Sequence, residues 1–122
     1  MKRDWDLIRE VLIEVEALDP AKHENIQYGP ASSSSEPVKD SQAVMLWRAG
    51  FILGVDASSS DGDAIFALDL SWAGHEMLDT IRSQAVWERI KATAQTKGLE
   101  LTFESVKVLG KFAWDWVASQ PG

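Results

Sequence analysis

The chain of 122 residues contains no cysteine. It therefore has no disulfide, no thiol nucleophile and no thiolate zinc site. It also lacks an apolar run of the ~18 residues that a membrane span needs. The first residues, Met1 to Asp6, lead into acidic residues and a helical pattern rather than an apolar stretch, so we expect no signal peptide. These absences predict a cytoplasmic protein.

Basic residues are scarce, and the longest basic cluster is Lys2-Arg3. Nineteen Asp and Glu outnumber twelve Lys and Arg, giving a net charge of −7 and an isoelectric point near 4.7. Nucleic-acid binders usually carry a basic surface, because neutralising phosphates supplies much of their affinity. The charge balance therefore disfavours DNA as a partner and is compatible with a basic protein surface.

The composition is that of an ordinary globular protein, with 45% hydrophobic and 25% charged residues. A chain of this length fits one domain, residues 1–122, with one apolar core. Six tryptophans are many for this length. Such side chains either fill a core or anchor an interface, so sorting them is informative.

The hydrophobic periodicity predicts five helices and three short extended segments. Asp4 is expected to cap the first helix, Gly98 to end the fourth, and a helix to follow Thr102. The expected helices cover residues 4–18, 36–49, 72–82, 84–97 and 103–118, and the extended segments cover 25–28, 51–55 and 64–70.

This order predicts an α+β fold with a winged-helix-like core, a two-stranded wing and additional C-terminal helices. The core is expected to span residues 1–82. Residues 83–122 are expected to form a helical extension that packs on it. The Asp-Gly pair at Asp61-Gly62, among other turn formers, marks the tip of the wing hairpin.

The second helix is expected to begin after a cap at Ser35, with Pro37 in its first turn. The residues expected to face inward are Val38, Gln42, Met45, Leu46 and Ala49. At ~100° per residue, Asp40, Val44 and Trp47 fall on the opposite side. Either the C-terminal helices cover Val44 and Trp47, or this apolar pair anchors a partner or a second copy.

Several colinear segments resemble domain-of-unknown-function family 2513. The most specific are the Met-Lys-Arg-Asp start and the Gly-His-Glu segment at residues 74–76. The matching segments read MKRDWDLIR (1–9), LWRAGFI (46–52), LSWAGHEMLD (70–79) and VW (86–87). The resemblance implies a winged-helix-like fold and a phage or prophage setting, and it implies no particular activity.

His75-Glu76-Met77-Leu78-Asp79 is the nearest approach to a catalytic motif. Zinc proteases place two histidines one helical turn apart with an intervening Glu, but Asp79 stands at the second position here. The simpler interpretation is a half-buried His75 that hydrogen-bonds locally, for instance to Asp79. Neither a serine-nucleophile elbow nor a phosphate-cradling glycine loop is present in the sequence, so we expect no enzyme, metal or cofactor.

In a winged helix, the second helix of this chain would occupy the place that reads DNA. Its only basic residues are Lys39 and Arg48, and the wing tip carries Asp56, Asp61 and Asp63 where a DNA-binding wing presents cations. The sequence therefore favours a protein partner over DNA. The candidate partner-binding residues are Asp40, Val44, Trp47 and Arg48, with the acidic wing tip as a second surface.

Three functions stay open at this point. The leading one is a non-enzymatic module that binds a protein. The second is a phage-encoded inhibitor of a host defence or nucleic-acid enzyme, whose carboxylates imitate phosphates. The third is a winged-helix transcription regulator. Homodimerisation through the second helix or the tryptophan-rich last helix fits any of them.

Overall fold

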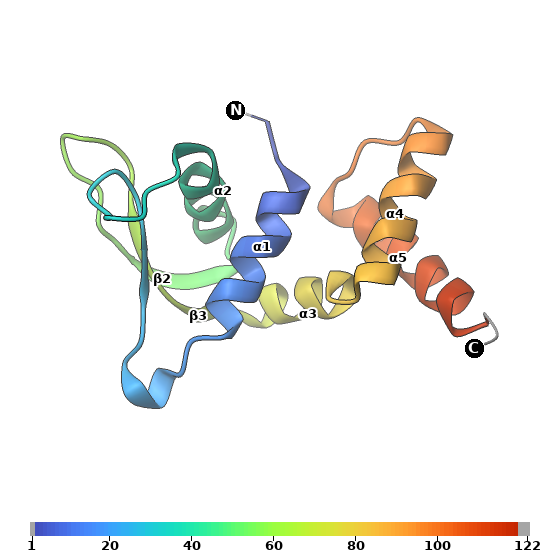
Figure 1. The fold of residues 1–122 in the computed structure, drawn as a ribbon, viewed down its shortest axis with the longest axis horizontal. Helices are drawn as coiled ribbons and strands as arrows, with labels where there is room; N and C mark the ends of the chain where they lie inside the picture. Colours follow the sequence, from blue (N-terminus) through green and yellow to red (C-terminus); the bar gives the residue numbers. More distant parts are fainter. Residues whose placement is uncertain (1, 120–122) are drawn as a thin grey trace. The chain divides into compact units, whose positions relative to one another are not determined.

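A computed structural model describes residues 2–119 and divides the chain into two compact units, residues 1–75 and 76–122. The fold is α+β, with five α-helices and a three-stranded antiparallel sheet (Figure 1). The division falls within helix α3 (Trp72–Ile81), earlier than the expected boundary at residues 82 and 83. The expected packing of the C-terminal extension on the core stays a prediction.

The first unit begins with α1 (Trp5–Glu16), whose apolar stripe supplies much of the core. Asp4 caps the helix as predicted, since its carboxylate accepts a hydrogen bond from the Leu7 N–H. Pro20 then opens a single 3-10 turn, Pro20–Lys22, rather than continuing the helix. The helix buries Ile8, Val11, Leu12 and Val15.

The sheet has the strand order β1-β3-β2, so the last strand in the sequence lies in the middle. Its strands are β1 (Ile26–Tyr28), β2 (Ile52–Asp56) and β3 (Ile65–Leu70). In the central strand, Ile65 and Ala67 are buried while Phe66 and Leu68 are exposed, which is the period-two alternation of a half-buried sheet. The hairpin of β2 and β3 confirms the expected pair of strands.

Helix α2 (Pro37–Arg48) packs against α1 and against the sheet. The predicted cap at Ser35 is wrong. Pro37 occupies the first turn, so Glu36 is the N-cap residue, without a side-chain hydrogen bond to the helix. Ser35 donates instead to the Asp40 carboxylate at 2.7 Å.

The predicted inward stripe of α2 is correct for Gln42 and Leu46, and wrong for Val38, which is 61% exposed, and for Ala49, which is exposed as well. Val44 and Asp40, expected on the opposite side, are buried as well. The helix has neighbours on more than one side, so its buried face is broader than its apolar stripe. Gln42 can be buried because its amide bonds the Asp4 N–H and the Lys2 carbonyl.

The second unit contains the end of α3 and a pair of helices, α4 (Gln84–Lys97) and α5 (Phe103–Ala118). Gly98 ends α4 in the left-handed region with φ 66°, and Thr102 caps α5, both as predicted. The two helices pack against each other, and Arg89 of α4 lies over the Trp116 ring near the end of α5. The two helices are orange and red in Figure 1.

Candidate binding groove

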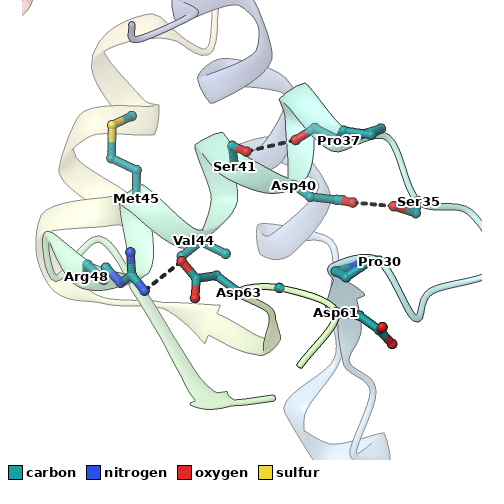
Figure 2. Close-up of a pocket in the computed structure, with 11 residues that line it drawn as sticks. Pro30, Ser35, Pro37, Asp40, Ser41, Val44, Met45, Arg48, Asp61 and Asp63 are labelled. Atoms are coloured by element: carbon teal, nitrogen blue, oxygen red, sulfur yellow. Dashed lines mark hydrogen bonds and ion pairs between the residues drawn. The ribbon is translucent and has the colours of Figure 1, made fainter. Parts of the chain in front are cut away.

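A groove with a volume of about 510 Å³ lies beside α2 in the first unit (Figure 2). Three segments enclose it: α2 itself, the loop of residues 30–35, and the wing loop of residues 57–64 between β2 and β3. The residues that line it are Pro30, Ser35, Pro37, Asp40, Ser41, Val44, Met45, Arg48, Asp61, Gly62 and Asp63. All of them belong to the first unit, so its geometry does not depend on the second.

Close packing holds the two loops next to each other. A Cβ atom on Gly29 would lie 2.2 Å from the Ala64 Cβ, so only glycine allows the backbone after β1 to approach the wing this closely. Pro30 lies against Gly62, where a Cβ atom would be 3.6 Å from the Pro30 Cγ. Within the wing loop, Ser58 bonds both backbone groups of Ala64. The groove walls are therefore fixed by short contacts at their base.

The floor of the groove is apolar. Val44 is only 5% exposed and Met45 is half-buried, while Pro30 and Pro37 contribute ring surface from either side. Val44 is therefore reached by a partner only through the groove that it lines. An apolar floor of this kind favours burial of an apolar side chain from a ligand.

Carboxylates dominate the polar lining. Asp40 is 8% exposed and accepts the hydrogen bond from Ser35, whereas Asp61 and Asp63 lie exposed on the wing loop. The Arg48 guanidinium lies 3.1 Å from the Asp63 carboxylate, and Figure 2 shows the two side chains pointing toward each other. Both side chains are more than half exposed, so this ion pair is a weak, solvent-screened one.

The other cation of α2, Lys39, is held on the side of the helix that faces α1. Its ammonium lies 2.9 Å from the Glu10 carboxylate and bonds Glu14 as well. Burial lowers the pKa of Lys39, but the hydrogen bonds that its ammonium donates to Glu14 and Glu10 outweigh this effect and raise the pKa above its ordinary value. Lys39 is therefore a charged structural residue rather than a free surface cation.

Tyr28 completes this polar cluster, since its hydroxyl donates to Glu14 at 2.8 Å. Burial and the neighbouring Glu14 carboxylate raise the pKa of Tyr28, because both disfavour a tyrosinate. The hydroxyl thus remains a donor at any physiological pH. One carboxylate, Glu14, is satisfied by both Lys39 and Tyr28.

The groove brings together five of the seven residues that the sequence singled out: Asp40, Val44, Arg48, Asp61 and Asp63. Trp47 is half-buried and Asp56 is exposed, and neither of them lines the groove. Hydrogen bonds from Ser58 lower the pKa of Asp56 and keep that carboxylate charged. Sequence reasoning missed Pro30, Ser35 and Met45 as lining residues, although the Gly29-Pro30 pair was a turn signal for a loop that returns toward the helix.

The expected hydrogen bond from His75 to Asp79 is wrong. The His75 Nε2 lies 3.8 Å from the Asp69 carboxylate at the end of β3, and Asp79 pairs with Arg82 instead. The chain turns from β3 into α3, and this turn brings Asp69 closer to His75 than Asp79, one helical turn further on. Within residues 2–119, no three His, Asp or Glu side chains are grouped so that they could hold a metal ion.

The tryptophans divide sharply by exposure. Trp87 is 1% exposed and belongs to the core, whereas Trp72, the first residue of α3, is 81% exposed. Two residues further along the same helix, Gly74 is buried against the Phe51 carbonyl oxygen. A Cβ atom on Gly74 would lie 2.1 Å from that oxygen, so no larger residue fits there. On α5 the exposed apolar side chains are Val108, Phe112, Trp114 and Trp116.

The structure is that of an α+β protein with an acidic, partly apolar groove. Among the described residues, none of the helices has the length and apolar character needed to cross a membrane. The chain belongs to the DUF2513 family, described as a hypothetical protein, whose model matches residues 2–100. This confirms the resemblance found in the sequence, and the matched residues include the whole groove and end before α5.

A protein of Haemophilus influenzae is 37% identical over 107 residues, covering 88% of this chain and 90% of the relative. That coverage extends the family assignment over most of both chains. No solved structure matches the chain.

Proposed function

We propose that the chain is a non-enzymatic module that acts by binding another protein, with residues 1–75 as a winged-helix-like core. The order helix, strand, helix, strand, strand and the sheet order β1-β3-β2 support this description, with the β2–β3 hairpin as the wing. Helix α2 then has the place of the DNA-reading helix. The choice between a protein and DNA as partner therefore depends on the charged groups that α2 can present.

The observation that carries the proposal is the pairing of both α2 cations inside the unit. Lys39 is held by Glu10 and Glu14, and Arg48 by Asp63. A phosphate contact would have to displace these carboxylates, and Asp61 lies exposed on the same wing. Since phosphate contacts supply most of the non-specific affinity for DNA, the helix lacks the usual source of that affinity.

The non-enzymatic part of the proposal rests on the sequence. It contains no cysteine and no nucleophile elbow or glycine-rich phosphate loop. We take the setting to be cytoplasmic, and phage or prophage-derived, as the family resemblance implied. A homodimer formed through α2 or α5 is compatible with the same function.

Affinity capture from a bacterial lysate, with and without nuclease, tests whether the partner is protein. We expect a protein partner that remains bound after nuclease treatment. Trp47→Ala should weaken the capture if this half-buried side chain contributes to it, with the exposed Trp72→Ala as the matched control. Loss of all bound material on nuclease treatment would contradict the proposal and favour a transcription regulator.

A second candidate function is a phage-encoded inhibitor that imitates nucleic acid. The uneven charge favours it: residues 1–75 contain thirteen Asp and Glu against six Lys and Arg, so this unit carries the whole net charge of −7. A concentrated field of one sign steers binding to a basic groove. Reversing Asp56, Asp61 and Asp63 to Lys should abolish inhibition of such an enzyme, and unchanged inhibition would eliminate this candidate.

A further inference from the structure

We propose that the groove beside α2 binds an extended polypeptide segment of the partner that places a Lys or Arg next to an apolar side chain. The inference rests on the proposed protein-binding function and specifies the chemistry of its partner. It depends on three properties of the groove, namely its size, its apolar floor and its charge.

The size suits a short segment rather than a folded surface. A volume of about 510 Å³ falls within the roughly 300–1,000 Å³ typical of pockets for small ligands. A few side chains of a peptide fill such a space. The walls are pinned by the Gly29–Ala64 contact, so the space is largely formed before the ligand arrives.

The apolar floor of the groove favours an apolar side chain in the ligand. Val44 and Met45 form its helical part, and Pro30 and Pro37 flank them. Removing this surface from water stabilises a complex in proportion to the apolar area that is covered. A purely polar cation such as a polyamine would leave the floor uncovered.

The carboxylates that line the groove favour a cationic side chain in the ligand. Three carboxylates, those of Asp40, Asp61 and Asp63, line the groove against one guanidinium, that of Arg48. The field within the groove is therefore negative, which favours Lys and Arg in a ligand and repels phosphate.

The Arg48–Asp63 ion pair indicates how the ligand cation binds. The guanidinium from α2 reaches the wing carboxylate across the groove at 3.1 Å, so it holds the position that an incoming Arg would take. Ligand and Arg48 then compete for Asp63. Removing Arg48 should strengthen binding, whereas a merely structural ion pair predicts no gain.

The test is a titration of the full-length, isotope-labelled chain by nuclear magnetic resonance. The probes are four capped, otherwise identical glycine-serine peptides that contain Leu-Arg, Leu-Glu, Gly-Arg or Leu-Gln at the centre. We expect Leu-Arg to shift amide signals at residues 30–48 and 61–63, and the other three to bind more weakly. Equal binding of Leu-Arg and Leu-Glu, shifts confined to other residues, or no shifts at millimolar peptide would each overturn the inference.

Three variants and a control sharpen the result. Asp63→Asn and Asp61→Asn should each weaken Leu-Arg binding about two- to fivefold, the range of an exposed ion pair, while Arg48→Gln should strengthen it by a similar factor. Glu100→Gln removes one exposed charge from the second unit and should change nothing. Weaker binding by Arg48→Gln would contradict the competition.

The two levels of the proposal fail differently. If captured protein partners survive nuclease but are retained unchanged by Asp61→Asn and Asp63→Asn, protein binding stands and the groove is not the site. If the captured material is nucleic acid, the proposed function itself fails.

Discussion

The two units of the chain differ in net charge. Residues 1–75 hold thirteen acidic and six basic residues, whereas residues 76–122 hold six of each. In the first unit, the cations of α2 pair with carboxylates. In the second, Arg89, Lys91 and Lys107 each lie over an aromatic ring, at 4.3 to 5.4 Å from its centroid. Both units expose apolar side chains, for example Phe66 and Trp72 in the first and Phe112 and Trp114 in the second, but only the first has an excess of carboxylates.

This difference shows that net charge alone does not describe a binding surface. The second unit is neutral: three of its six cations lie near aromatic rings, and Arg82 and Lys91 pair with Asp79 and Glu88. The first unit is acidic because its thirteen acidic residues outnumber its six basic ones, and the two cations of α2 are paired with carboxylates. We therefore expect salt to affect binding by the first unit and to affect the second very little.

The largest expected effect concerns Trp87, the one tryptophan that the structure buries almost completely. Trp87→Ala should lower the free energy of unfolding by about 3–5 kcal/mol, through lost burial and the cavity left behind. Trp72→Ala, at an 81% exposed position, should change it by less than about 0.5 kcal/mol. Urea unfolding followed by circular dichroism measures both, and equal losses would contradict the sorting of the tryptophans.

Two glycine substitutions compare packing in the two units. In Gly74→Ala the new methyl would meet the Phe51 carbonyl oxygen at 2.1 Å, and backbone cannot move aside, so we expect a loss of about 2–3 kcal/mol. In Gly110→Ala it would meet the Thr80 methyl at 2.3 Å, which can move away only if the stiff Thr80 side chain gives up its hydrogen bond to the Glu76 carbonyl, so the loss should be about 1–2 kcal/mol. Thermal unfolding tests the order, and a larger loss for Gly110→Ala would reverse it.

Tyr28 gives a pH test of the first unit alone, because it is the only tyrosine of the chain. Its raised pKa means that the folded state keeps a proton that the unfolded state loses above pH 10, so stability should fall as the pH rises beyond that value. An ultraviolet titration should show no tyrosinate until the protein unfolds. Ionisation near pH 10 in the folded state would show that Glu14 does not hold the hydroxyl.

A smaller effect than for Trp87 or Gly74 is expected for Lys39→Gln, which leaves Glu10 and Glu14 without their shared cation. We expect a loss of about 1 kcal/mol, because the ammonium is largely covered but Glu10 is half exposed. Because Lys39 has a raised pKa, its contribution is complete below the ordinary value of 10.5 and disappears as the pH rises through the folded value. Lys22→Gln, which removes one exposed positive charge, provides the charge-matched control in denaturant unfolding.

Local chemistry made much of the fold predictable. Asp4, Gly98 and Thr102 act on backbone groups within three or four residues of themselves, so their effects can be read from short stretches of sequence. The β2–β3 hairpin was predictable for the same reason, from two strand-like runs with turn formers between them.

The wrong predictions concern residues whose burial and partners are determined by segments distant in the sequence. Val38 belonged to the predicted stripe of α2 and is exposed, while Asp40 and Val44 are buried beside loops from elsewhere in the chain. His75 pairs with Asp69 across a strand-to-helix turn, which helical spacing does not reveal. The acidic residues of the groove were predictable as a surface, but its walls depend on the Gly29–Ala64 contact.

The central claim is that carboxylates of the first unit occupy the cations that a DNA-reading helix would need. Fluorescence anisotropy of a labelled DNA duplex, titrated with the chain from about 50 to 200 mM salt, tests it directly. We expect no saturable binding by the natural sequence, and a gain of salt-sensitive binding when Glu10→Gln, Glu14→Gln and Asp63→Asn together release Lys39 and Arg48. A tight, salt-sensitive complex with the unaltered chain would contradict the claim.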